Sequence, residues 1–451
     1  MDIVWLARVQ FALTVMFHFL FPPISIGLSL LIAILETMRW RTGKRLYERA
    51  ADFWLKIFAV TFAVGVATGI VMEFEFGTNW AGYSRFVGDI FGAPLAAEGV
   101  FAFFLESGFL GLLLLGRKRI SSTVRWVAAL MVCLGTNLSA FWILVANSWM
   151  QTPAGYRIAG GRAELTDFSA AVFNPSTLPR LLHTITASWV CAGFLMIGIA
   201  AWYVVKGRKT DVARLSLRMG LIAAAVGCVA VSVTGDRHAR QVARTQEAKF
   251  AAMEGLYSTT KGAPLILFSL PPRQEARSEG PELTITRLTS FLAFGNFQAP
   301  VKGLDEFPRE DWPPIAATFL SFHNMVIVGN VMLLEVLFGL FLLWRGRLET
   351  SRRWLWLMVF SVPLPHLAIQ LGWMAAEAGR QPWIVYGVMR TRDAVSKVVT
   401  APQLVFSIAL FSVIYLALGA LWIYLLRREI LHGLEEQPTQ AVLPALRPQE
   451  I

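Results

Sequence analysis

The chain has 451 residues, of which 55% are hydrophobic and only 16% are charged, and its formal net charge is +11. A soluble domain of this composition would expose too much apolar surface, so we exclude that class. The basic residues form short clusters between apolar runs, which favours orientation in a membrane over binding of nucleic acid. We therefore expect a protein embedded in a lipid bilayer, with no nucleic acid partner.

Nine apolar runs are long enough to cross a bilayer as helices. They cover residues 11–36, 53–76, 92–115, 124–148, 181–205, 215–234, 315–344, 354–376 and 403–426. The sequence predicts an all-α, polytopic integral membrane protein with about nine transmembrane helices.

The charges between the runs predict how the chain is oriented. Clusters of Lys and Arg follow the first, third, fifth, seventh and ninth runs, and such clusters stay in the cytoplasm. The N-terminus should therefore lie outside and the C-terminus inside. The sixth connection is basic but long, and long loops escape this rule. We expect helices 1–6 in residues 1–234, an outer loop in 235–314, helices 7–9 in 315–428 and a cytoplasmic tail in 429–451.

Four residues with metal-binding side chains fall in the outer part of the predicted spans. They are His18 ahead of Pro22-Pro23, His183 at the start of the fifth span, Met325 in the seventh and Glu377 at the end of the eighth. Because His, Met and some oxygen donors ligate haem iron, this layer is a candidate set of axial ligands. The shared depth alone does not separate haem from a transported ion.

Taken one at a time, most of these residues have simpler explanations. His183 fits an interfacial residue at a helix end, and Met325 fits ordinary packing. Glu377 could cap its helix or pair with Arg380, three residues later. His18 is harder to explain, since its sequence neighbours are aromatic and aliphatic. The shared depth therefore favours function.

The third span contains two acids, Glu98 and Glu106, eight residues apart. On a helix they share roughly one face and lie about 12 Å apart in depth. Ionisable residues inside a membrane usually have a function, so we predict a proton path leading inward. Pairing with bases on neighbouring helices is the alternative.

The outer loop contains the sequence RTQEAKFAAMEGLY at residues 244–257. Lys249 and Glu254 are five residues apart on a predicted short amphipathic helix. Such a pattern is usually a solvated face. It gains a function only if an amphiphilic substrate docks at the outer surface.

Four motifs resemble subunit I of the cytochrome bd-type quinol oxidases, and the likeness runs through the ninth span. In order of specificity they are GWMAAEAGRQPW (372–383), AAEGVFAFFLES (96–107), ARVQFALTVMFHFLFPP (7–23) and the looser TQEAKFAAMEG (245–255). The resemblance implies a terminal oxidase of the bacterial cytoplasmic (inner) membrane. Such an enzyme oxidises quinol outside and reduces dioxygen to water with cytoplasmic protons, which generates a proton motive force without pumping.

The resemblance also implies cofactors and partners. The family holds two haem b and one haem d, and some relatives use haem b in place of haem d. It works as a heterodimer with subunit II, sometimes with a small single-span third subunit. By motif, His183 and Met325 match the axial ligands of the low-spin haem b. His18 and Glu377 match ligands of the two high-spin haems, with the haem that each one holds left open.

Other residues match the family's proton and quinol sites. Glu98 and Glu106 match acids on the proton route. Arg380 and Trp373 match residues packed against the high-spin pair. The last pair, Lys249 and Glu254, matches the quinol-oxidation site in the outer loop, the Q-loop.

Two positions depart from the family pattern. His323 stands where an arginine near the low-spin haem is common, so it would stabilise the haem propionates less and could compete as a ligand. Glu247 stands where the quinol motif has proline. Two other functions remain open on the residues alone: a proton- or ion-coupled transporter, and a b-type electron carrier without oxygen chemistry.

Overall fold

The computed structural model describes residues 2–116, 119–208, 210–268 and 282–433. Within these ranges, nine helical segments are long and apolar enough to cross a membrane. The predicted all-α, multi-pass architecture is therefore confirmed, although four small two-stranded antiparallel sheets occur in the connections. Most of the predicted tail, residues 434–451, lies outside the described residues.

Several of the nine spans are built from more than one helix. The spans are α1 (Ile3–His18) with α2 (Pro22–Thr42), α3 (Arg45–Thr78), α4 (Ala81–Ala97) with the π-helix η1 (Glu98–Phe103) and α5 (Phe104–Leu115), α6 (Ser122–Gln151), α8 (Thr177–Val205), α9 (Asp211–Thr245), α12 (Ile315–Trp344), α13 (Arg352–Phe360) with α14 (Leu364–Ala378), and α16 (Ala401–His432).

The connections contain shorter elements. The helices are α7 (Phe168–Val172), α10 (Glu247–Glu254), α11 (Leu288–Phe294) and α15 (Thr391–Ala394), with 3-10 turns η2 (Leu304–Glu306) and η3 (Arg309–Asp311). The strand pairs are β1 (Tyr156–Ala159) with β2 (Arg162–Leu165), β3 (Thr260–Lys261) with β6 (Pro300–Val301), β4 (Leu265–Phe268) with β5 (Leu283–Ile285), and β7 (Trp383–Val385) with β8 (Met389–Arg390).

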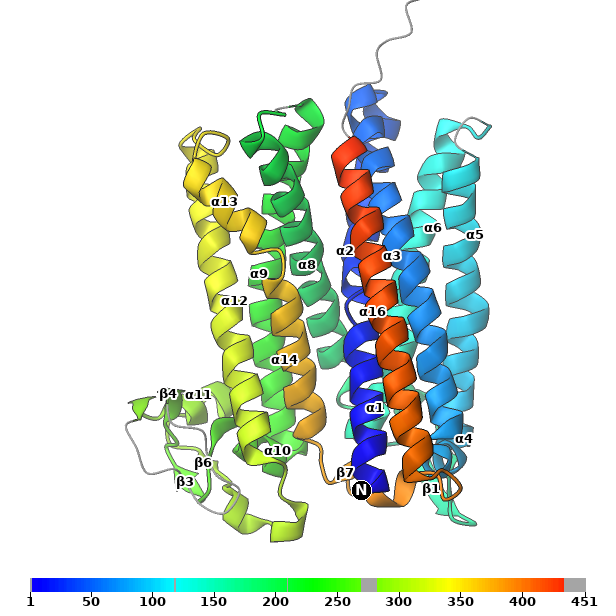
Figure 1. Ribbon diagram of the computed structural model, residues 1–451. Coiled ribbons are helices and arrows are strands. Elements are labelled where there is room, and N and C mark those ends of the chain that lie inside the picture. The colour runs from blue at the N-terminus through cyan, green and yellow to red at the C-terminus, as the bar shows by residue number, and fades with distance from the viewer. Residues whose placement is uncertain (1, 117–118, 209, 269–281, 434–451) are drawn as a thin grey trace, which may run out of the picture.

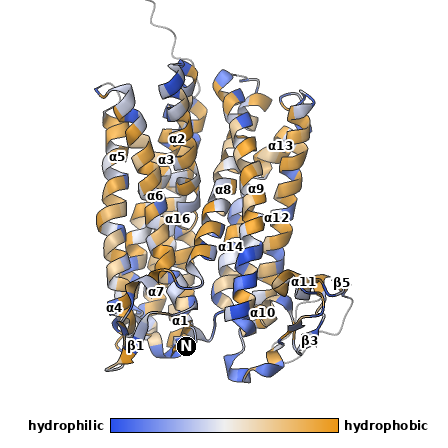
Figure 2. Cartoon of the chain, turned by 180° about the vertical axis from the view of Figure 1, so that it is seen from behind, coloured by the Kyte–Doolittle hydropathy of each residue, from blue (hydrophilic) through white to orange (hydrophobic). Residues whose placement is uncertain are grey.

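The helices form one bundle with two sides (Figure 1). Helices α1–α6 and α16 make one side, α8, α9 and α12–α14 make the other, and α2 packs against α8 between them. The N-terminus lies at the same end of the bundle as α10 and α11, which we call the loop end, and α16 finishes at the opposite end. Figure 2 shows hydrophobic residues along most of the bundle and hydrophilic residues mainly at its two ends.

Interruptions in three spans position candidate site residues. The first span stops at His18 and restarts at Pro22, because proline lacks an N–H and suits the first position of a helix. The third span changes to a π-helix at Glu98, a feature often found at functional sites. The eighth span breaks between Phe360 and Leu364, so that Glu377 lies in the last turn of a separate short helix.

Some helix ends differ from the prediction, because polar helical turns resemble loops in the sequence. Helix α9 continues to Thr245, beyond the expected loop start at 235, and its end is held by buried Val242 and Ala243. Helix α8 begins at Thr177, so His183 lies nearly two turns inside it and is no helix-end residue.

A buried ion-pair cluster joins three helices near the end of the bundle opposite the loop end. Arg125 of α6 contacts Asp52 of α3 at 2.6 Å and Glu36 of α2 at 2.7 Å. Arg125 and Glu36 are only 2% and 1% exposed. Removing one member of such a cluster leaves buried charge poorly compensated, so the three helices must keep these side chains together.

We expect Arg125→Met to lower the free energy of unfolding by about 3–5 kcal/mol, because Glu36 and Asp52 both lose the buried guanidinium that they share, and the less buried Arg39, 3.5 Å from Glu36, replaces only part of its charge. The measurement is denaturant unfolding of the purified protein in detergent. Arg157→Met is the matched control, because Arg157 pairs with Glu164 at the surface, where such pairs contribute about 0–1 kcal/mol. Equal effects of the two substitutions would contradict the assignment.

Candidate functional site

One face of α6 carries a series of polar side chains through the apolar bundle. Thr136, Ser139, Asn147 and Gln151 fall within about 120° of arc around the helix. The series spans about 22 Å along the helix axis. Each of the four binds a carboxylate that the sequence singled out.

The two acids of the third span both face α6. The Thr136 hydroxyl donates to Glu106 at 2.7 Å, and the Ser139 hydroxyl donates to Glu98 at 2.8 Å. Neither carboxylate forms an ion pair with another described residue, so the structure gives no support to pairing with neighbouring bases. The two acids are joined to hydroxyl groups of one helix.

Glu377 is bound from two directions at the loop end of the bundle. Its Oε1 accepts hydrogen bonds from Asn147 Nδ2 and Gln151 Nε2, both at 3.1 Å. Its Oε2 accepts from Arg380, which is 5% exposed, so the salt bridge considered from the sequence is present. The two amides of α6 show that Glu377 does more than end a helix.

Lys249 connects the loop to this carboxylate. Its Nζ donates to Gln151 Oε1 at 2.9 Å and lies 3.4 Å from Gln246 Oε1. Burial and the nearby charge of Arg180 lower the pKa of Lys249 well below its usual value. Gln151 therefore bridges Lys249 and Glu377 with the two ends of one amide.

The predicted short helix is present as α10, and it is not the solvated face that such a pattern usually forms. Seven of its eight residues are buried, and only Glu247 remains accessible, paired with Lys302 at 2.7 Å. The rest of the loop folds over the helix, and the Thr289 hydroxyl reaches Glu254 at 3.2 Å. Burial raises the pKa of Glu254 to about 7. Lys249 and Glu254 thus share one short buried helix.

Both candidate histidine ligands pack against a Thr-Gly pair on the neighbouring helix. His18 Nδ1 lies 2.9 Å from the Thr68 hydroxyl, and a Cβ added to Gly69 would lie 3.2 Å from the His18 ring.

His183 repeats this arrangement on α9. Its Nδ1 lies 3.5 Å from the Thr234 hydroxyl, and a Cβ added to Gly235 would lie 3.1 Å from the ring. In both histidines, a partner at Nδ1 orients the ring and leaves Nε2 as the nitrogen for a metal.

Residues 372–373 of α14 contact several candidates from other helices. A Cβ on Gly372 would lie only 2.9 Å from Met325 Sδ, so glycine is what lets the thioether fit there. The Trp373 ring packs edge-to-face on Phe19, with ring centroids 5.1 Å apart, and lies 5.9 Å from the Arg180 guanidinium. The motif thus touches Phe19, just after the end of α1, and the helices α8 and α12.

His323 is turned toward the loop. Its Nδ1 lies 3.0 Å from the Phe319 carbonyl oxygen, and its Nε2 lies 2.9 Å from that of Ile266 in β4. Since both ring nitrogens face backbone carbonyls, the arrangement does not favour His323 as a competing ligand beside Met325.

Sequence reasoning missed Arg180 and the polar partners on α6. Arg180 falls just before the predicted fifth run, 181–205, yet it lies in α8 and is 3% exposed. Its spacing of three residues from His183 places both on one helix face, a signal that was present in the sequence.

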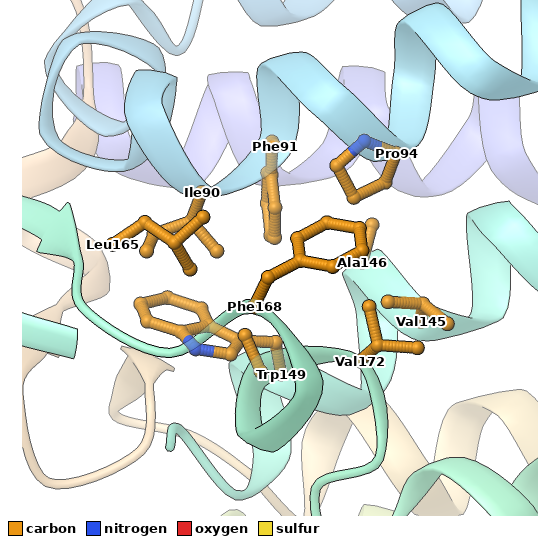
Figure 3. Close-up of a pocket in the computed structure, with 10 residues that line it drawn as sticks. Ile90, Phe91, Pro94, Val145, Ala146, Trp149, Leu165, Phe168 and Val172 are labelled. Atoms are coloured by element: carbon orange, nitrogen blue, oxygen red, sulfur yellow. The ribbon is translucent and has the colours of Figure 1, made fainter. Parts of the chain in front are cut away.

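Apolar side chains pack around the part of α6 that carries Asn147 and Gln151. Figure 3 shows side chains of α4, α6, β2 and α7 around a small cavity of about 10 Å³, including Phe91, Pro94, Val145 and Trp149. The residues that line this space are apolar almost throughout. It is a contact between helices and provides no polar group for a substrate.

We expect Gln151→Leu to loosen α10, because the buried Lys249 ammonium loses its best partner at a cost of about 1–3 kcal/mol. Amide hydrogen exchange of residues 247–254 should become roughly five- to hundredfold faster. Asn147→Leu is the matched control, because Asn147 also binds Glu377 but does not touch Lys249. Unchanged exchange in Gln151→Leu would refute the bridge.

Comparison with known proteins bears on the whole chain. The family model described as cytochrome bd terminal oxidase subunit I matches residues 6–434. Cytochrome bd ubiquinol oxidase subunit 1 of Bacillus subtilis is 41% identical, covering 95% of this chain and 94% of that protein. Cytochrome bd-II ubiquinol oxidase subunit 1 of Escherichia coli is 35% identical, covering 97% and 99% respectively.

Solved structures agree with the sequence comparison. The bd oxidase from Geobacillus thermodenitrificans matches with a TM-score of 0.88 and 30% identity, covering 95% of this chain and 98% of that one. These matches exclude the transporter and the simple electron carrier that the residues alone had left open. This chain belongs to the cytochrome bd terminal oxidase subunit I family, and it is a subunit of a quinol oxidase.

Proposed function

We propose that this chain is the haem-carrying subunit of a bd-type oxidase in the bacterial cytoplasmic membrane. It oxidises quinol at the loop end, which faces outward, and reduces dioxygen to water with protons from the cytoplasm. Subunit II is its partner, and a small third subunit can join them. The observation that carries the proposal is the buried network from Lys249 through Gln151 to Glu377, which links the loop to one of the candidate haem ligands.

The buried charges around Glu377 fit a cofactor that carries carboxylates. Arg180, Arg380 and Lys249 act electrostatically on this single acid, and Arg380 is paired with it. Arg180 Nε, Arg380 Nε and Arg380 Nη1 are buried without a hydrogen-bond partner among the described residues. Unpaired buried N–H groups are costly, and haem propionates would accept from them.

The ligand types also fit haem. His183 and Met325 would hold the low-spin haem b, and His18 and Glu377 would hold the two high-spin haems, one of them haem d or a haem b in its place. When bound, these groups supply electron transfer and the iron at which dioxygen is reduced. The protein orients the two histidine rings through Thr68 and Thr234.

Lys249 and Glu254 are the proposed quinol-oxidising pair. Oxidation of a quinol releases two electrons and two protons, so a base must be close to its hydroxyl groups. A carboxyl group with a pKa of about 7 suits this role near neutral pH. Lys249 would bind the quinol oxygen on the side facing Gln151.

The proposed proton route follows α6. Glu106 and Glu98 hold protons at their carboxyl groups, and the Thr136 and Ser139 hydroxyls lie against them at 2.7 Å and 2.8 Å. Protons taken from the cytoplasm and released outside by quinol make the reaction electrogenic without a pump. Trp373 and Arg380 pack beside the site where these protons are used.

A difference spectrum of the purified complex, reduced minus oxidised, tests the haem assignment together with quinol-driven oxygen uptake. We expect haem bands and uptake in the wild type. Gly372→Ala should weaken the low-spin band and slow uptake at least tenfold, because its Cβ forces Met325 Sδ to move.

Gly329→Ala is the control on the helix that carries Met325, since a Cβ there meets nothing within 4 Å. A haem-free wild-type complex would overturn the proposed function. A normal spectrum for Gly372→Ala would remove Met325 from the ligand set only.

The pKa of Glu254 predicts how quinol oxidation depends on pH. Below about pH 7 the carboxyl group is protonated and cannot accept a proton, so the base form is lost as pH falls. We expect kcat/KM for quinol to rise about tenfold between pH 6 and pH 8. In Glu254→Gln this rise should disappear, whereas Glu247→Gln, a surface change on the same helix, should keep it. A wild-type profile in Glu254→Gln would contradict the role.

A further inference from the structure

Two polar side chains lie beside His183 and are not among the proposed haem ligands. Arg180 precedes His183 by one turn on α8, and His238 lies one turn after Gly235 on α9. The His238 and His183 rings are 5.8 Å apart between centroids and tilted by 56°. Arg180 Nε and His238 Nε2 are both buried without a hydrogen-bond partner among the described residues.

The nearby acid does not satisfy Arg180. Glu377 already accepts from Arg380, Asn147 and Gln151, and no ion pair joins it to Arg180 within the described chain. The guanidinium lies instead against the Trp373 ring, 5.9 Å from its centroid. The charge of Arg180 is therefore available to another anion.

A third unsatisfied group lies on the same face of α8. Thr177 precedes Arg180 by three residues, is fully buried, and its hydroxyl has no partner among the described residues. His323 cannot contribute, because both its ring nitrogens face backbone carbonyls. A guanidinium, a hydroxyl and an imidazole N–H are all donors, and a carboxylate accepts from all three.

We propose that Arg180 and His238, with Thr177, form the binding site for a propionate carboxylate of the haem held by His183 and Met325. The inference rests on the proposed function and assigns residues that its ligand set leaves out. The permanent charge of Arg180 favours the reduced haem, because reduction adds negative charge to the group beside it. Arg180 and His238 thus raise the midpoint potential of the haem that accepts electrons from quinol.

A quinol headgroup is the competing occupant of this site. Gln241, one turn beyond His238, has a buried Oε1 without a described donor, and a quinol hydroxyl could donate to it. A carboxylate could not, because it only accepts. The charge of Arg180 and the donor set favour the carboxylate, and the quinol becomes an outcome of the test.

The test is a redox titration of the low-spin haem absorbance in the purified complex, beside the KM for quinol. We expect Arg180→Leu to shift the midpoint potential to more negative values and to leave KM within about twofold of wild type. His238→Leu should shift the potential in the same direction, and His238→Asn should restore much of it by keeping an N–H donor. Arg237→Leu removes an exposed charge from the next position of α9 and should change neither quantity.

Other results would overturn the inference. A raised KM with an unchanged potential, especially in Gln241→Leu, would assign the site to quinol. Unchanged potential and KM in His238→Leu and Arg180→Leu would make both residues structural. If Arg180→Leu does not assemble, the same titration is made on Arg180→Lys and the two His238 variants. These variants keep a positive charge at position 180. A wild-type complex without a low-spin haem would instead be a failure of the proposed function.

Discussion

The two-ended amide of Gln151 is the interaction on which the site depends. Its oxygen accepts from Lys249 and Gln246, and its nitrogen donates to Glu377, so rotating the amide would place like groups against each other on both sides. Inside a membrane no water replaces a lost partner, so buried polar groups depend on partners within the protein. Thr136, Ser139 and Asn147 of α6 likewise donate hydrogen bonds to carboxylates on neighbouring helices.

The apolar runs predicted the spans well, because crossing a bilayer requires about twenty apolar residues. The seventh span was predicted as 315–344, and α12 covers the same residues. The polar end of α9 was read as loop, because the contacts that bury Val242 and Ala243 come from segments distant in the chain. Composition shows the membrane-crossing length of a helix, and tertiary packing determines where the helix stops.

The candidate site was predicted in part. Motif residues such as His18 and Glu377 could be named singly, but their partners could not, since Asn147 and Gln151 lie 230 and 226 residues from Glu377. The burial of α10 was missed for the same reason, because the loop that covers it has no pattern of its own. The two Thr-Gly pairs at 68–69 and 234–235 were a readable signal, and their meaning needed the rings that pack on them.

The glycines beside the candidate ligands and the unpaired buried arginine N–H groups both indicate that a cofactor belongs to the folded structure. Glycines leave room beside His18, His183 and Met325, where any side chain would press on the candidate ligand. Buried guanidinium groups on Arg180 and Arg380 have N–H donors that no described residue accepts from. A haem whose iron was held by these candidate ligands, and whose propionates accepted from these guanidinium groups, would contribute to stability as an internal residue does, because binding to the folded state alone favours that state. On the proposed ligand set, folding of this subunit and binding of haem would be coupled through the same contacts.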